Sequence, residues 1–275
     1  MRVLTHAAEL SPFDGCAFVP TMGALHEGHL SLVRAAAAGG APVVVSIFVN
    51  PTQFAPHEDF TRYPRPIERD LALAESAGAA AAFVPPAEVI YPPSEVIEVP
   101  PLPGVATAPQ LEDRVRPGHF AGVCQVVARF FDLVRPMTAY FGQKDFQQLR
   151  VVESMVECSP TRWKGLRIAP HPTVREEDGL AMSSRNIYLA PQERLRAVGL
   201  FRALQSANAA NHPATAELLM KQTLTAHDLE IQYAVVRDAN SLMPVSDFSR
   251  PTRALIAVKL GAVRLIDNAA LTVLR

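Results

Sequence analysis

One stretch decides the expected fold: Val19-Pro20-Thr21-Met22-Gly23-Ala24-Leu25-His26-Glu27-Gly28-His29. Its first residues have the character of a buried strand, its middle is a loop that contains glycine, and its end begins a helix. The first turn of a helix offers unpaired backbone N–H groups and the positive end of the helix dipole, which together suit a phosphate group. The stretch therefore predicts a strand–loop–helix unit that binds a phosphate-bearing ligand.

Two histidines and a glycine give this unit its chemistry. His26 and His29 are three residues apart, so they share one face at the start of the helix. Gly28 between them allows a nucleotide to approach the backbone closely. For either histidine alone, a capping or core role is the alternative interpretation, and Glu27 is expected to be solvated. Because the stretch lacks both the Gly-Lys-Ser/Thr run of a Walker loop and the histidine spacing of a metalloprotease, a nucleotide site of another type is favoured.

The rest of the first half alternates strands and helices. Strands are expected at residues 16–19, 43–49, 81–84 and 138–141, and helices at 30–38, 66–77 and 122–133. This order predicts an α/β fold, with a Rossmann-like parallel sheet covered by helices on both faces. Ligands of such sheets bind at the carboxyl ends of the strands.

Two further regions of the chain depart from this alternation. Residues 85–117 are rich in proline and are expected to run over the surface, with a short strand at 96–99. Further on, helices at 197–210 and 214–226 precede strands at 231–236 and 254–258, an order that predicts a small α+β domain. We place the domain boundary at residue 173, which gives domains of residues 1–173 and 174–275.

Two segments with polar residues lie between these elements. In the first, a buried strand ends in Asn50 and Gln53, whose amides offer the donors and acceptors that a hydroxylated, carboxylated substrate requires. The alternative interpretation is that Asn50-Pro51 simply marks a turn. The second segment is Arg-Pro-Gly-His-Phe-Ala-Gly, residues 116–122, which precedes a helix.

Two more segments offer positive charge. In residues 141–148, where a strand end passes into a helix start, Lys144 is a counter-charge for phosphate. Further along, Ser183 and Ser184 stand beside Arg185 and form a candidate anion clamp. The alternative for this last group is an ordinary helix start that a serine caps.

Composition narrows the class of protein. Hydrophobic residues make up 49% and charged residues 19% of 275 residues, which is a globular balance, and the formal net charge of −1 argues against a nucleic-acid partner. Cys16, Cys124 and Cys158 have no metal-binding spacing, so we expect buried or half-buried thiols in a reducing compartment. No signal peptide and no apolar run of membrane-spanning length is visible. We therefore expect a soluble, cytoplasmic protein with no membrane partner.

Taken together, these segments resemble a known family. The H-x-G-H pattern is similar to that of the nucleotidyltransferase superfamily, and the five segments in this order resemble the pantothenate synthetase family, whose members are pantoate–β-alanine ligases. The resemblance extends from about Phe18 to about Asn268 and includes Leu265-Ile266-Asp267-Asn268. It implies a Rossmann-like N-terminal domain that carries the site, a smaller C-terminal lid domain and a homodimer.

The resemblance also implies a reaction in two steps, with ATP and Mg²⁺. Pantoate attacks the α-phosphorus of ATP, which releases pyrophosphate and leaves pantoyl adenylate. The amine of β-alanine then attacks the acyl carbon, displaces AMP and gives pantothenate. Because the carboxyl group of pantoate is already ionised at neutral pH, the first step needs aligned anions and stabilised charge rather than a general base.

The family's functional residues map onto this chain by their motifs. The implied catalytic residues are His29 as proton donor, with His26, Lys144, Ser183, Ser184 and Arg185. The implied ATP-binding residues are Pro20, Met22, Gly23, Ala24, Leu25, His26, Glu27, Gly28, His29, Gly142, Gln143, Lys144, Asp145, Val174, Met182, Ser183, Ser184 and Arg185. The implied pantoate-binding residues are Asn50, Gln53 and Gln148.

The metal ligands and two departures from the family stay open. We expect Mg²⁺ to bind mostly through phosphate oxygens. Asp70 and Asp145 are candidate ligands, although a solvated position on a helix surface is at least as good an interpretation for Asp70. Gln143 stands where the resemblance leads us to expect Glu, so any role for that carboxylate is lost. Thr52 stands where Met is common.

Three other functions fit the residues less well. An adenylyltransferase of the same superfamily would share H-x-G-H, but it gives no reason for Gln53 and Gln148 to accompany the segment 116–122. A catalytically dead nucleotide-binding module has no physical reason to keep His26, Lys144 and the other implied catalytic residues together. A tRNA synthetase is disfavoured because no basic region is visible.

Overall fold

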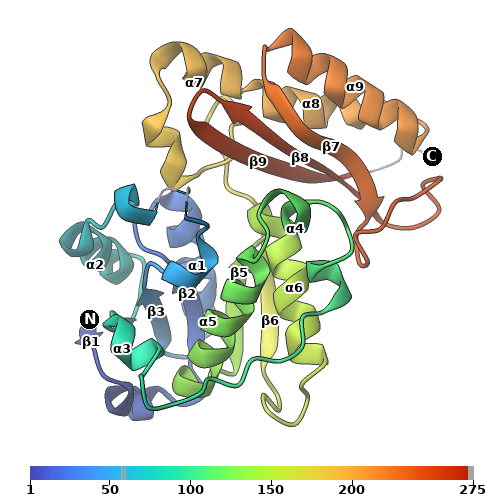
Figure 1. Cartoon of the computed structure of the whole chain (residues 1–275). Helices are drawn as coiled ribbons and strands as arrows, with labels where there is room; N and C mark the ends of the chain where they lie inside the picture. Colours follow the sequence, from blue (N-terminus) through green and yellow to red (C-terminus); the bar gives the residue numbers. More distant parts are fainter. Residues whose placement is uncertain (57, 59, 272–275) are drawn as a thin grey trace.

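The fold consists of two β-sheets with separate helical coverings. The computed structural model describes residues 1–56, 58 and 60–271. A six-stranded sheet, the N-terminal sheet, has the order β1-β4-β3-β2-β5-β6, and all its pairings are parallel. A three-stranded antiparallel sheet, the C-terminal sheet, has the order β7-β8-β9 and lies across one end of the first (Figure 1). The predicted α/β class and the small α+β unit at the C-terminus are confirmed.

Strands and helices alternate in the N-terminal part, whereas three helices precede three strands at the C-terminal end. The strands are β1 (Arg2–Leu4), β2 (Ala17–Thr21), β3 (Val43–Ile47), β4 (Ala81–Phe83), β5 (Thr138–Gly142), β6 (Arg167–His171), β7 (Glu230–Asp238), β8 (Thr252–Leu260) and β9 (Val263–Leu271). The α-helices are α1 (Glu27–Ala38), α2 (Ile67–Ser76), α3 (Ala87–Ile90), α4 (Glu112–Val115), α5 (His119–Val134), α6 (Phe146–Glu157), α7 (Pro191–Ala197), α8 (Gly199–Ala207) and α9 (Pro213–Ala226). Short 3₁₀ turns at Pro51–Gln53, Gln143–Asp145 and Ser184–Tyr188 contribute to the site described below.

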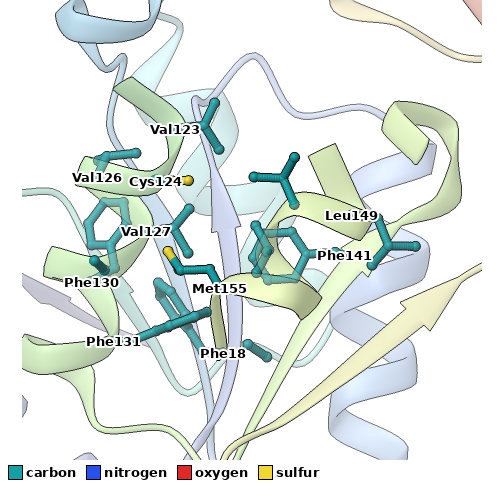
Figure 2. Packing of buried hydrophobic residues seen from close by; sticks show 14 of the residues in the cluster. Phe18, Val123, Cys124, Val126, Val127, Phe130, Phe131, Phe141, Leu149 and Met155 are labelled. Carbon is teal, nitrogen blue, oxygen red and sulfur yellow. The ribbon is translucent and has the colours of Figure 1, made fainter. Parts of the chain in front are cut away.

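Strand β2 separates two apolar cores. Successive side chains of a strand point to opposite faces of the sheet. Phe18 accordingly packs on one face, in a core that includes residues of α5 and α6 such as Phe131 and Met155 (Figure 2). Ala17 and Val19 pack on the other face, in the core formed with α1 and α2. Helices therefore cover both faces of the N-terminal sheet, as the sequence predicts.

The position of β2 also fixes where a ligand can bind. In the sheet order β2 lies between β3 on one side and β5 on the other, so the chain leaves β2 towards one edge and later returns to its other side. Such a switch point opens a crevice at the carboxyl ends of the strands. Residues 19–29, which contain His26 and His29, begin in β2 and end in α1, directly at this crevice.

The C-terminal sheet packs in two directions. Along β8, Ala254 and Ile256 belong to the core shared with α8 and α9, whereas Leu255 and Ala257 belong to the core of the N-terminal sheet. The same alternation that gives a strand two faces therefore joins this sheet to both of its neighbours. No helix within residues 1–56, 58 and 60–271 is long and apolar enough to span a membrane.

Several sequence expectations are corrected by the structure. Residues 96–99 form no strand, since β-branched residues there lack a neighbouring strand to pair with. Strands β1, β6 and β9 were not predicted; β1 has only three residues, and β6 contains a proline that suits the edge strand it forms. Cys16 and Cys124 are buried as expected, but Cys158 is exposed at the end of α6.

Candidate active site

A cavity lies at the carboxyl ends of β2, β3, β5 and β6. Its volume is about 230 Å³, and it continues into a wider cleft of about 570 Å³ between the two sheets. Lys144, Asp145, Gln148, Ser183 and Arg185 line both spaces. The crevice predicted from the strand order is therefore present, and it opens towards the C-terminal sheet.

The two histidines form a capping box at the start of α1. His26 is the N-cap residue, and its Nδ1 accepts a hydrogen bond from the backbone N–H of Gly28 at 3.1 Å. Nδ1 of His29 accepts from the backbone N–H of His26 at 3.3 Å. A nitrogen that accepts carries no proton, so each neutral ring bears its hydrogen on Nε2. Helix capping thus sets the tautomer of both rings as Nε2–H donors.

Both histidines are neutral at physiological pH in this environment. Desolvation and the charge of Lys144 lower the pKa of His26 to about 4. Desolvation and the neighbouring His26 lower the pKa of His29 to about 3. The two ring centroids are only 4.1 Å apart, which disfavours protonation of both rings together. The capping interpretation and the ligand-binding interpretation are therefore compatible, because capping uses one nitrogen of each ring.

The structure gives a steric reason for glycine at position 28, in addition to the predicted approach of a nucleotide. A Cβ at this position would lie 2.9 Å from Cε1 of His26, so the glycine makes room for the capping imidazole. Glu27 is exposed, and one of its oxygens accepts from Arg34 at 3.0 Å, so the predicted solvated role of Glu27 is confirmed.

Asp70 does not lie in a solvated position on a helix surface, so that interpretation is wrong. Its side chain is fully buried, and its two oxygens accept from the backbone N–H groups of Ala24 and Leu25 at 2.7 and 2.8 Å. These donors belong to a loop in which Gly23 and Ala24 both have positive φ, +80° and +51°. Ala24 adopts a backbone region that L-residues seldom occupy, and the carboxylate stabilises it. The signal in the sequence is that Ala74, four residues later, is apolar and shares the helix face of Asp70.

Asn50 and Gln53 are linked to each other. Asn50 is buried; its Nδ2 donates to Oε1 of Gln53 at 3.1 Å and to the carbonyl of Gly122 at 3.1 Å. Its Oδ1 accepts from Tyr91 at 2.6 Å and from the hydroxyl of Thr52 at 3.0 Å. Because these bonds use both ends of the Asn50 amide, Asn50 serves to orient Gln53.

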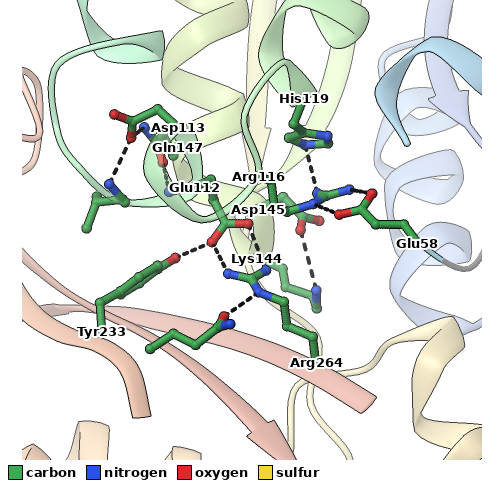
Figure 3. A network of polar contacts seen from close by, with 12 residues as sticks. Glu58, Glu112, Asp113, Arg116, His119, Lys144, Asp145, Gln147, Tyr233 and Arg264 are labelled. Carbon is green, nitrogen blue, oxygen red and sulfur yellow. Dashed lines mark hydrogen bonds and ion pairs between the residues drawn. The ribbon is translucent and has the colours of Figure 1, made fainter. Parts of the chain in front are cut away.

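Arg116 and His119 support the same turn, and neither has an individual role that the sequence predicts. Nδ1 of His119 donates to the carbonyl of Gln53 at 3.0 Å, and Nε2 of His119 accepts from Arg116 at 3.0 Å. Arg116 also pairs with Glu58 through two bonds of 2.7 and 2.8 Å (Figure 3). Burial and the charge of Arg116 lower the pKa of His119 to about 4. This network explains why residues 116–122 accompany Gln53.

Gly122 allows α5 to approach the Gln53 turn. A Cβ at Gly122 would lie 2.3 Å from the carbonyl oxygen of Thr52, a distance that no side chain tolerates. The helix therefore contacts the turn backbone directly, and the glycine at the end of the segment 116–122 has a steric cause.

Lys144 and Asp145 place a positive and a negative group side by side in the lining of the cleft. Nζ of Lys144 lies 3.5 Å from Oδ1 of Asp145 (Figure 3). Desolvation raises the pKa of Asp145, but Lys144 and Arg185 outweigh it and hold that pKa below its ordinary value. An anionic Asp145 that is half exposed in a cleft beside a lysine is suited to contact a cation or an amine.

The serine segment, residues 182–185, reaches the cavity from the C-terminal side. Oγ of Ser183 caps the 3₁₀ turn by accepting from the N–H of Arg185 at 3.3 Å, so the serine-cap interpretation is confirmed for Ser183. Oγ of Ser184 lies 3.3 Å from the hydroxyl of Tyr63, a buried residue that the sequence analysis did not single out. The guanidinium of Arg185 lies 6.0 Å from the ring centroid of Tyr63.

The structure brings most of the predicted residues together. The smaller cavity is lined by Pro20, Met22, His26, Gly28, His29, Asn50, Gln53, Gly142, Lys144, Asp145, Gln148, Val174, Met182, Ser183, Ser184 and Arg185. Five predicted ATP-binding residues line neither cavity: Gly23, Ala24, Leu25, Glu27 and Gln143. The first three belong to the loop before the histidines, in which Ala24 has a positive φ. Glu27 faces solvent, and the side chain of Gln143 accepts from Arg253 at 3.4 Å.

Comparison with known proteins agrees with this geometry. The sequence model of the family described as pantoate-beta-alanine ligase matches residues 2–270. A pantothenate synthetase of Rubrobacter xylanophilus is 48% identical, over 92% of this chain and 90% of its own length. One of Thermus thermophilus is 46% identical, over 98% of each chain.

Two solved structures share the fold. A pantothenate synthetase of Thermus thermophilus superposes with a TM-score of 0.92 at 43% identity, over 98% of this chain and 99% of its own. The pantoate-beta-alanine ligase of Francisella tularensis, in complex with beta-gamma ATP and beta-alanine, superposes with a TM-score of 0.81 at 30% identity, over 98% and 97%. With a family model over nearly its whole length and relatives of this similarity, the chain belongs to the pantoate–β-alanine ligase family and is an enzyme.

Proposed function

We propose that this cleft condenses pantoate with β-alanine at the expense of ATP and forms pantothenate through pantoyl adenylate. The observation that carries the proposal is the convergence of two Nε2–H imidazoles with Lys144 and Arg185 on one cavity, which also contains the amides of Gln53 and Gln148. The first group suits a polyphosphate, and the amides suit a hydroxylated carboxylate. Membership of the family supports the same assignment.

In the first step we assign charge stabilisation to the histidines. ATP would place its phosphates near the start of α1, where the two Nε2–H groups donate and the helix dipole is favourable. Lys144 and Arg185 would neutralise charge that develops on the departing pyrophosphate. A proton from His29 requires that bound phosphate first raises the depressed pKa of His29, since a nearby negative charge favours the protonated ring.

We assign substrate positioning to the Gln53 turn and to Gln148. Nε2 of Gln53 lies 3.1 Å from Sδ of Met22, a weak acceptor that a substrate oxygen can replace. Asn50, His119 and the backbone contact of Gly122 hold the turn from behind. In the second step the neutral amine of β-alanine, placed next to the acyl carbon, forms the C–N bond, AMP leaves with the electrons of the acyl C–O bond, and the amine proton passes to solvent.

We also propose that Mg²⁺ accompanies ATP. Among the described residues no group of three His, Cys, Asp or Glu side chains is arranged to hold a metal ion. Asp70 is not a ligand, because its two oxygens already accept from backbone N–H groups. Asp145 fits as a single protein contact, with phosphate oxygens and water as the other ligands. When bound, the ion neutralises phosphate charge.

The division into domains and the assembly are further proposals. We place the boundary at residue 173, so that residues 174–275 form a lid over residues 1–173. Support comes from the separate core that α8, α9 and the C-terminal sheet share. A homodimer and a cytoplasmic location follow from the family resemblance, and the three free cysteines accord with a reducing compartment.

Pyrophosphate release tests the proposed function. The protein is incubated with ATP, Mg²⁺ and pantoate, first without and then with β-alanine. We expect pantoate-dependent release, with pantothenate and AMP formed in quantity only after β-alanine is added. If the folded protein binds ATP but shows no pantoate-dependent release, the proposal is wrong, and transfer of AMP to a phosphorylated acceptor becomes the next candidate.

A further inference from the structure

The strand β9 contains a polar pair, Asp267-Asn268, to which the proposed function gives no task. Asp267 is 2% and Asn268 3% exposed, so both are buried polar residues. They belong to the motif Leu265-Ile266-Asp267-Asn268 near the end of the chain. A buried polar side chain is costly unless its hydrogen bonds are made within the protein, so the partners of this pair are informative.

Asn268 binds the backbone of the lysine loop, residues 142–145. Its Nδ2 donates to the carbonyl of Gln143 at 2.9 Å and to the carbonyl of Lys144 at 2.7 Å. Its Oδ1 accepts from Nε of Arg253 at 2.6 Å. Both ends of the amide are therefore used, and two of its bonds clamp the peptide units on either side of the Lys144 Cα.

Asp267 binds a different segment. Its two oxygens accept from Arg175, at 2.6 and 3.0 Å, in a paired geometry that fixes the guanidinium. Arg175 in turn donates to the carbonyl of Gly179 at 3.0 Å. Its backbone forms an isolated antiparallel β-bridge with Ala181, just before the serine segment. Desolvation raises the pKa of Asp267, and Arg175 opposes this shift.

We propose that Asp267-Asn268 positions the catalytic groups by bracing the lysine loop and the serine segment against one strand. Successive side chains of a strand point in opposite directions, so adjacent residues of β9 reach two separate loops. Lys144 and Arg185 approach the substrate from these two loops, and the brace sets their separation. The inference rests on the proposed function, and it makes the C-terminal sheet part of the positioning machinery in addition to a cover.

The lysine loop depends on such support. It is a single 3₁₀ turn between β5 and α6, and a 3₁₀ turn has weak hydrogen bonds of its own. Among the described residues, the polar contact of the Lys144 side chain is a long one, 3.5 Å from Nζ to Oδ1 of Asp145. Its placement is therefore set by the backbone that Asn268 holds. A shift of about 1 Å in a group that aligns reactants lowers a rate by about 100-fold.

The test compares Asn268→Ala with a variant that loses a different buried hydrogen bond between the C-terminal sheet and the N-terminal part of the chain. Tyr233 on β7 donates to Glu112 on α4 at 2.6 Å, beside the pair that Arg264 forms with Glu112 at 2.8 Å (Figure 3). Tyr233→Phe removes this buried hydrogen bond without touching the lysine loop. We expect pantoate-dependent exchange of pyrophosphate into ATP to fall by about 30- to 100-fold in Asn268→Ala and by less than threefold in Tyr233→Phe.

A double-mutant cycle separates positioning from general stability. If Asn268 acts through Lys144, adding Asn268→Ala to Lys144→Ala lowers the exchange rate by no more than about threefold further. Full additivity, or an Asn268→Ala rate within threefold of wild type, would overturn the proposal. So would an equal loss of exchange in Tyr233→Phe.

A second variant covers the case in which Asn268→Ala fails to fold. Asn268→Asp keeps the shape and the acceptor for Arg253 but cannot donate to the two carbonyls, so its exchange rate should also fall at least 30-fold. Amide hydrogen exchange at residues 143–146 should accelerate in Asn268→Asp and stay unchanged in Tyr233→Phe. If wild type itself shows no pantoate-dependent exchange, the proposed function fails. If wild type and Asn268→Asp are equally active, the proposed function stands and only the positioning role of Asn268 is wrong.

Discussion

Two loops at the same edge of the N-terminal sheet are held in different ways. The histidine loop, residues 22–29, follows β2 and is held by Asp70, which lies in the same part of the chain on α2. The lysine loop, residues 142–145, follows β5 and is held by Asn268 of the C-terminal sheet. Both devices use a buried side chain to satisfy backbone groups, one as an acceptor and the other as a donor.

The difference shows which half of the site depends on the C-terminal sheet. The histidine loop makes its supporting contacts within the N-terminal part, because Asp70 and the capping box both belong to it. The lysine loop is complete only when β9 is docked beside it. A shift of the C-terminal sheet is therefore expected to move Lys144 and to leave His26 and His29 where they are.

The largest expected effect comes from removing the groups that are proposed to be catalytic. His29→Ala and Lys144→Ala should each lower turnover by about 10²- to 10⁴-fold, because each removes a group that stabilises charge or transfers a proton. Steady-state release of pyrophosphate measures the effect, and thermal unfolding confirms that both variants fold. Lys221→Ala, an exposed lysine on α9, is the control. Near-normal turnover in both variants would refute the assigned roles.

Removing the acceptor behind the histidine loop should come next. Asp70→Asn places an amide donor against the N–H groups of Ala24 and Leu25, and an unsatisfied buried donor costs about 1–3 kcal/mol. We expect turnover to fall about 10- to 100-fold as the loop relaxes. Asp247→Asn is the matched control, since Asp247 accepts a backbone N–H in an exposed turn.

Combining the two loop variants sharpens the comparison. Because Asp70 and Asn268 hold different loops, the losses of turnover in Asp70→Asn and Asn268→Ala should multiply in the double variant. A double variant no worse than the weaker single one would mean that the two loops are held as one unit, and the contrast between them would disappear.

Acid should destabilise the histidine loop. The pKa values of His26 and His29, about 4 and about 3, lie below the value of an unfolded chain, so the unfolded state binds more protons between those values and about pH 6.5. The stabilisation that comes from keeping these two histidines neutral is therefore complete above about pH 6.5 and is lost as the pH falls towards 4. Between pH 7 and pH 5 each histidine should contribute about 2 kcal/mol of this loss.

Denaturant unfolding at a series of pH values checks the contribution of the histidines. His26→Asn and His29→Asn should each make the free energy of unfolding less dependent on pH in this range. His212 is the matched control, since it also caps a helix by accepting a backbone N–H but is exposed. A pH dependence that His212→Asn flattens as much as His29→Asn does would contradict the assignment.

The smallest expected effect is a gain in stability at the lysine loop. Gln143→Glu would place a carboxylate beside Arg253, whose pKa burial lowers to about 10. The new ion pair should stabilise the fold by about 1 kcal/mol, or about 2–4 °C in Tm. Gln232→Glu is the control, because its partner Arg264 already has Glu112. A lower Tm in Gln143→Glu would show that this part of the interface does not tolerate charge.

Much of the candidate site was predictable because its residues lie at strand ends. The carboxyl ends of parallel strands meet at one edge, so His26, Gln53 and Lys144 were expected near one another although they are far apart in the chain. Their roles were harder to assign. Asn50 lines the cavity, and its predicted contact with substrate stays a prediction, while its amide also bonds within the protein. Hydrogen-bond partners from distant segments decide between such roles, and residue type alone does not reveal them.

The sequence alone determined the local units of this protein. Hydrophobic periodicity, glycine placement and the capping residues of α1 depend on neighbours in the chain, so the strand–loop–helix unit with its two histidines could be recognised directly. Only the tertiary structure decided that Asp70 is buried beneath one loop and that Asn268 reaches a loop 124 residues earlier. The physical reason is that a buried polar group takes whichever partner the packing of distant elements presents, and that packing is a property of the whole fold.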